Sequence, residues 1–104
     1  MPNLYTGTIN GREPSRAGVG TTSEVVVPEN MTRTGLVFTN ISDQTIYLGV
    51  GHTATLKAGI VLTPAGGVWS MDEFSYNKQA ITAIAHSSTL VVAIQEFYDV
   101  YQTN

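Results

Sequence analysis

Short runs of β-branched and aromatic residues, each closed by a cluster of turn formers, follow one another along most of this chain. The turn signals recur at roughly 8- to 12-residue intervals, a spacing typical of all-β sandwiches and barrels. No segment sustains the i, i+3, i+4, i+7 pattern of an amphipathic helix over three turns. We therefore predict one antiparallel β-sandwich of about seven strands, with Ig-like or jelly-roll-like topology. The predicted strands cover residues 25–27, 36–39, 45–50, 59–63, 68–71, 80–85 and 89–98.

The first part of the chain has a different composition. Residues 1–22 are rich in Gly, Thr, Asn, Ser and Arg and show no periodicity. We expect them to form an extended N-terminal arm with one short strand at residues 4–9, and residues 23–104 to form the sandwich domain. A frayed terminus would give the same composition, so this alternative stays open.

Alternation within the predicted strands indicates which side chains face the core. Small residues at Ala83, Ala85 and Ala93 would let the two sheets approach closely or pack against Trp69. A hairpin turn is expected at residues 86–88, between the last two strands. The large side chains predicted to line the two inner faces are Phe38, Ile46, Leu48, Leu62, Trp69, Ile81, Leu90, Val92 and Ile94.

Charge and composition exclude several classes of function. Only 12% of the residues are charged and the net charge is −3, so the five basic residues cannot form the stripe that nucleic acid requires. The absence of cysteine excludes a disulfide scaffold and a thiolate zinc site. No apolar run is long enough to span a membrane, and we expect no secretory signal.

No group of residues indicates catalysis. His52 and His86 fall at predicted turns, and neither has a His or Glu two residues away to share a metal ion. The carboxylates are scattered, and no G-x-S-x-G motif is present. We therefore predict no catalytic, metal-binding or cofactor-binding residues and no enzyme, although a small metal-dependent barrel enzyme remains the weakest alternative.

Two further features concern partners. The stretch 97–101 is apolar on both sides of an extended chain, so it is either paired inside its own domain or added to a neighbouring sheet. Trp69, Tyr47 and Tyr76 could stack against sugar rings, which leaves a host-surface or carbohydrate-binding module as an alternative function.

Four segments of the predicted sandwich contain distinctive motifs. They are residues 33–49, with Asn40-Ile41-Ser42-Asp43 followed by Ile46-Tyr47-Leu48-Gly49, residues 59–67 with a closing Gly66-Gly67, residues 80–84 and residues 90–96. These motifs resemble those of small virion proteins of tailed bacteriophages. The Asn-x-Ser-Asp cluster caps a corner between strands, and the glycines supply positive φ angles. The resemblance spans about residues 24 to 98 and leaves the arm outside.

The resemblance implies a structural protein of the virion, made in the host cytoplasm. We expect an auxiliary capsid decoration (cement) protein that binds the major capsid protein in the assembled head, as a homotrimer. A tail, neck or fibre component is the alternative within the virion. The residues expected to contact the capsid are Leu4, Tyr5, Ile9, Arg12 and Arg16, and those expected to join the subunits are Phe97, Tyr98, Val100 and Tyr101.

Overall fold

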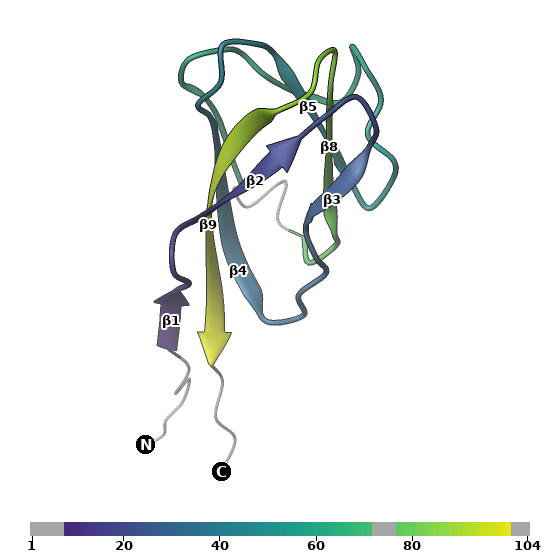
Figure 1. The fold of residues 1–104 in the computed structure, drawn as a ribbon. Helices are drawn as coiled ribbons and strands as arrows, with labels where there is room; N and C mark the ends of the chain where they lie inside the picture. The colour runs from purple at the N-terminus through teal and green to yellow at the C-terminus, as the bar shows by residue number, and fades with distance from the viewer. Residues whose placement is uncertain (1–7, 72–76, 101–104) are drawn as a thin grey trace, which may run out of the picture.

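The computed structural model describes residues 8–71 and 77–100, and every regular element within these ranges is a β-strand (Figure 1). Seven strands, β3 to β9, coincide with the seven predicted runs, so the all-β prediction is confirmed. The strands are β1 (Thr8–Gly11), β2 (Ser15–Val19), β3 (Glu24–Val27), β4 (Arg33–Asn40), β5 (Ile46–Val50), β6 (Ile60–Leu62), β7 (Gly67–Ser70), β8 (Ile81–Ala85) and β9 (Leu90–Val100).

The strands form two antiparallel sheets that pack face to face as a β-sandwich. The larger sheet has the order β1-β9-β4-β7, with β2 also paired to β9, and the smaller sheet has the order β3-β8-β5-β6. Strand β2 pairs with β9, β3 with β8, β4 with β7 and β5 with β6, so the chain is a long hairpin wrapped on itself. This nested pairing is the jelly-roll arrangement, one of the two topologies that the sequence left open.

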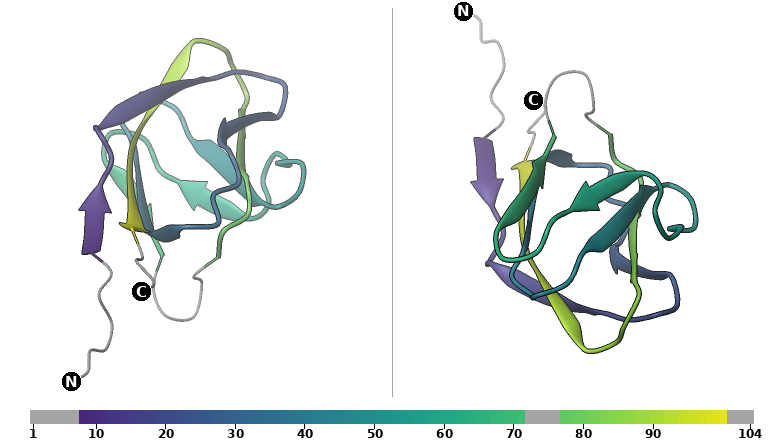
Figure 2. Two further views of the ribbon diagram at one scale, coloured as in Figure 1. Left: turned by 90° about the horizontal axis from the view of Figure 1, so that it is seen from below. Right: turned by 90° about the horizontal axis from the view of Figure 1, so that it is seen from above.

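The two sheets face each other in the ribbon (Figure 2). The side chains on their inner faces form one apolar core. Eight of the nine large side chains predicted to face inward are buried, as are Ala83 and Ala85. Trp69 is only half-buried, because β7 is an edge strand, and its ring stacks on Phe38 with centroids 6.0 Å apart. The prediction for Ala93 is wrong: this residue alternates with the buried Val92 and Ile94 and therefore lies on the outer face.

The prediction that residues 1–22 form an extended arm is wrong for those of them that the structure describes. Strand β2 pairs with β9 along its whole length, and Val19 is part of the core. Strand β1 pairs with the other end of β9, so residues 8–19 form one interrupted edge of the larger sheet (Figure 1). The sandwich therefore begins before the predicted boundary at residue 22, since β9 is long enough to pair with both segments. The predicted strand at residues 4–9 lies mostly outside the described residues.

The sequence predicted a hairpin turn at residues 86–88 and positive φ angles at Gly66 and Gly67, and these predictions have different outcomes. Residues 86–89 do not close a hairpin, because β8 belongs to the smaller sheet and β9 to the larger one. At the other turn, Gly66 has the predicted positive φ of 118°, and Ala65 has a positive φ of 55°. The prediction of a positive φ at Gly67 is wrong. Glycine is needed there because a Cβ would collide with the backbone of Thr63.

Candidate interaction surfaces

The predicted capsid-contact residue Arg12 binds groups of its own chain at the surface. Its guanidinium pairs with the Glu96 carboxylate at 2.9 Å and lies 5.0 Å from the centre of the Tyr98 ring. Its backbone N–H donates to the carbonyl of Glu96. Arg12 therefore fastens the corner between β1 and β2 onto β9, although half of its side chain remains exposed.

Sequence analysis did not identify the most buried charged residue, Arg33. Its side chain is fully buried, and its Nε donates to Glu96 at 2.7 Å. The two terminal nitrogens donate to the carbonyl oxygens of Gln79 at 2.7 Å and Pro28 at 2.8 Å. These contacts tie β4, β9 and two loops together at one end of the sandwich. The only sequence signal was a lone arginine at the start of an apolar strand.

Asn40 holds the corner at the opposite end of β4. Its amide nitrogen donates to the carbonyl oxygens of Gln44 and Leu62, and its amide oxygen accepts from the backbone N–H and the hydroxyl of Ser42. The chain crosses here from the larger sheet to the smaller one. The predicted role of the Asn-x-Ser cluster as the cap of a strand-to-strand corner is therefore confirmed.

Three of the four predicted subunit-contact residues lie in β9, which pairs with β1 on one side and, as far as Tyr98, with β4 on the other. Phe97 and Tyr98 are half-buried in β9, between β1 and the first residues of β4. The backbone of Val100 pairs with Thr8, and that of Ile9 pairs with Asp99. The intradomain alternative for the stretch 97–101 is thus confirmed as far as residue 100. Leu4, Tyr5 and Tyr101 lie outside the described residues.

Among the described residues, the outer face of the larger sheet carries no charged side chain where β7, β4 and β9 lie side by side. Cross-strand partners share a face, so the register assembles this surface into rows across β7, β4 and β9. Arg16, which pairs with Ala93, stands at the border on β2. A shallow hollow of about 180 Å³ lies between β2 and these strands. The residues of this uncharged face are Val37, Thr39, Val68, Ser70, Val91, Ala93 and Gln95.

The outer face of the smaller sheet is partly covered by the chain itself. The connection between β5 and β6 folds back over Gly49 and Thr82, and the Thr82 hydroxyl donates to the carbonyl of His52 at 2.7 Å. Ala54 in this connection is buried, and its N–H donates to the hydroxyl of Ser23. The loop therefore covers the part of this face around Gly49 and Thr82, whereas Val25 and Val61 on its edge strands stay exposed.

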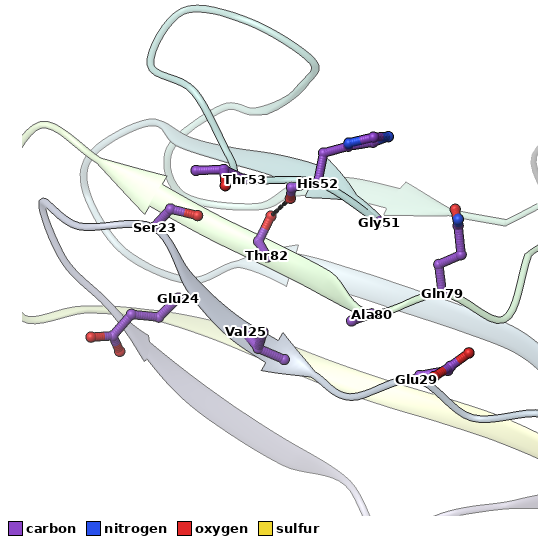
Figure 3. Close-up of a pocket in the computed structure, with 10 residues that line it drawn as sticks. All are labelled: Ser23, Glu24, Val25, Glu29, Gly51, His52, Thr53, Gln79, Ala80 and Thr82. Atoms are coloured by element: carbon purple, nitrogen blue, oxygen red, sulfur yellow. Dashed lines mark hydrogen bonds between the residues drawn. The ribbon is translucent and has the colours of Figure 1, made fainter.

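A pocket of about 550 Å³ opens beside β3, between this strand and the connection after β5 (Figure 3). Glu24 and Glu29 lie toward opposite ends of its rim, and His52 approaches from the facing loop. Within residues 8–71 and 77–100, no three His, Asp or Glu side chains are grouped so as to hold a metal ion. We assign no chemistry to this pocket.

The residues considered for the alternative functions, a metal-dependent enzyme and a carbohydrate-binding module, are not brought together into a site among the described residues. His52 and His86 are exposed at turns, as predicted, and the His86 ring lies against the edge of Tyr47 at 5.9 Å. Tyr47 is itself buried, and Trp69 is turned toward Phe38, so they do not form a shared stacking platform for a sugar. Tyr76 lies outside the described residues. No helix among the described residues could span a membrane.

Comparisons with known proteins bear on the fold. No family model matches this chain, and no curated protein matches its sequence. Among solved structures, the chain is similar to a protein of the Bacillus endospore appendages, which are described as a novel family of disulfide-linked pili. The match covers 94% of this chain and 92% of that chain, with 15% sequence identity and a TM-score of 0.51. Such a likeness establishes a shared β-sandwich fold.

Proposed function

We propose that this chain is a structural protein of a bacteriophage virion, an auxiliary decoration protein that binds the assembled head through the uncharged face of its larger sheet. The observation that carries the proposal is the absence of charge where β7, β4 and β9 lie side by side, whereas part of the smaller sheet's outer face is covered by the connection after β5. A surface of small and apolar residues loses little solvation free energy when a partner covers it, unlike a charged one. Arg16, at the border of this face, supplies one positive charge that pairs with an acidic group of the partner and so fixes its orientation.

The rest of the molecule supports a role as a rigid building unit. Jelly rolls occur in viral capsid domains, and two of the phage-like motifs, at Asn40 and at Gly66, lie at turns between strands of this fold. The protein that shares the fold comes from endospore appendages described as disulfide-linked pili. The residues of this chain include no cysteine, so contacts between its copies would not use disulfides.

The proposed mechanism is mass action. A protein that binds assembled shells but not free capsid subunits stabilises the shell by RT ln(1 + [L]/Kd), about 2.7 kcal/mol per site at a hundredfold excess over Kd. We further propose that the copies form a trimer at threefold or quasi-threefold positions of the head. In the alternative role, as a tail, neck or fibre component, the chain would bind a different virion protein through the same face.

The copy number per virion tests the proposal. Quantitative mass spectrometry of purified virions should find hundreds of copies, at a simple ratio to the major capsid protein. A dozen copies or fewer would replace the decoration role with a tail, neck or fibre role. Complete absence from virions would overturn both.

A pair of variants tests the face. Thr39→Glu places a charge at the centre of the uncharged face, whereas Val61→Glu places it on the exposed outer side of β6, in the other sheet. Sedimentation with assembled shells should show that Thr39→Glu loses binding and Val61→Glu retains it. Equal binding by both variants would exclude this face as the capsid-binding surface.

A further inference from the structure

The uncharged face of the larger sheet is hollowed on the side where β2 lies against β9 (Figure 1). Two hollows lie there, one of about 180 Å³ and one of about 280 Å³. Pro14, Ser15 and Ala93 line both of them, so the two hollows are continuous, and we call them together the β2 groove. Its lining also includes Arg16, Val37, Thr39 and Ile41.

The register of the sheet explains why the surface is hollowed here. Ala93 of β9 lies between Arg16 of β2 and Thr39 of β4, and cross-strand partners share a face. The methyl group in the middle of this row is shorter than the side chain on either side, so it leaves space above β9. Ile41 follows β4 and is 53% exposed, so an apolar side chain borders the groove where the chain leaves the sheet.

Arg16 brings an unpaired positive charge to the β2 groove. Both ion pairs within residues 8–71 and 77–100 involve Glu96, whose partners are Arg12 and Arg33. Arg16 is exposed, and its side chain makes no ion pair or hydrogen bond with any residue that the structure describes. Its charge is therefore available to a group outside the chain.

The lining of the groove favours a carboxylate that lies next to an apolar side chain. A guanidinium donates two parallel hydrogen bonds to a carboxylate, which fixes the carboxylate in place. Val37 and Ile41, by contrast, offer only apolar contact. Nucleic acid fits poorly, because its affinity comes from several phosphate contacts and the groove has one arginine. Arg16 and Thr39 lie two strand spacings apart, roughly 9–10 Å, which an extended peptide of about three residues spans.

The charge of the whole molecule limits where an acidic segment can bind. The net charge of the chain is −3, so most of its surface repels such a segment. Among the described residues, no carboxylate lines the β2 groove, so this repulsion is weakest there. Attraction at Arg16 combined with repulsion elsewhere gives specificity for one binding position.

We propose that the β2 groove binds an extended acidic segment of the major capsid protein. One carboxylate of the segment is held by Arg16, and a neighbouring apolar side chain sits over Ala93, against Val37 and Ile41. The inference rests on the proposed function, in which this face meets the capsid, and it names the kind of segment that the face recognises.

Three variants test the groove by sedimentation with assembled shells that lack this protein. Arg16→Glu reverses the charge, and Ala93→Leu fills the groove without changing the charge. Lys57→Glu is the matched control, because Lys57 is also exposed and makes no side-chain contact with the described residues, and it lies on the connection between β5 and β6. Arg16→Glu and Ala93→Leu should bind at least about tenfold more weakly, the loss expected for one hydrogen bond to a charged group, and Lys57→Glu should bind as the wild type does. Circular dichroism checks that each variant folds.

Arg16→Lys identifies the group that the groove holds. It keeps the positive charge and places an amine in the groove, which a carbodiimide joins to a carboxylate in direct contact with it. Mass spectrometry of the treated complex should find residue 16 linked to an Asp or Glu of the major capsid protein that lies beside an apolar residue. Lys57 of the same molecule should carry no link to the capsid protein.

Several results would overturn the inference. They are equal binding by Arg16→Glu and Lys57→Glu, no binding of the wild type to shells, no link from residue 16, or a link only to a second copy of this chain. If Thr39→Glu loses binding while Arg16→Glu binds normally, the face remains the capsid-binding surface and only the acidic segment is rejected. The copy number per virion is measured independently, so failure of the proposed function itself is distinguishable from failure here.

Discussion

Replacing Arg33 by methionine should destabilise this protein more than the loss of any exposed charge. The guanidinium is fully buried and bonds to Glu96, to Gln79 O and to Pro28 O. Methionine fills much of the same volume but offers no donor. The carbonyl oxygens of Gln79 and Pro28, in partly buried bonds, would lose this donor. Among the described residues, Glu96 would keep Arg12 and a longer contact of 3.3 Å from Asn30.

The structure sets the size of this effect. Removing one partner of a buried ion pair costs about 3–5 kcal/mol, because the other charge is left without compensation. Arg12 stays beside Glu96 and compensates part of its charge, which lowers this cost. Each carbonyl oxygen that loses its donor adds about 1–3 kcal/mol, because no hydrogen bond then offsets its desolvation. We expect a loss of about 3–5 kcal/mol, a large share of the 5–15 kcal/mol typical of a domain.

Urea unfolding followed by the fluorescence of Trp69, the only tryptophan, measures this loss. Arg12→Ala is the matched control, because it removes the 53% exposed partner of the same carboxylate and should cost about 0–1 kcal/mol. The double replacement of Arg33 and Glu96 by methionine should recover part of the stability, since it leaves no buried charge. Equal losses for Arg33→Met and Arg12→Ala would refute the reasoning.

Two further stability predictions use the same titration. Asn40→Ala should cost about 2–4 kcal/mol, because the buried amide satisfies four hydrogen-bonding groups at the corner after β4, and a loss under about 1 kcal/mol would contradict this role. Gly67→Ala should cost about 2 kcal/mol or more, because the new Cβ would meet the backbone of Thr63, which cannot move aside. Gly18→Ala, where the nearest atom would be 3.9 Å away, should change stability by no more than about 0.5 kcal/mol, and equal effects at the two glycines would argue against the steric explanation.

Local patterns predicted the strands well. The alternation at Ile46, Leu48 and Val50 and the runs bounded by turn formers depend only on neighbours in sequence, and they placed seven strands and most of the core. The Asn40 corner was also predictable, because asparagine and serine side chains bond to backbone groups only a few residues away. These are short-range effects that a single sequence records directly.

The candidate interaction surfaces were harder to predict, because they depend on pairing between strands that are far apart in the sequence. Residues 15–19 have no strand periodicity of their own, yet they form β2 because β9 offers them a partner some 70 residues later in the chain. The same pairing turned the expected arm into a sheet edge and engaged Arg12 with Glu96. Nothing near Arg33 in sequence indicates its burial, since its acceptors come from three separate segments.

The way β-sheets form explains which features the sequence predicted and which it did not. Side-chain alternation and turn chemistry are properties of adjacent residues, so they already specify an all-β chain with its inward-facing residues. Which strands are neighbours is decided by closing loops between distant segments and burying their faces together. That closure made the fold a jelly roll, brought β7, β4 and β9 side by side under one uncharged face, and placed Arg16 at its border.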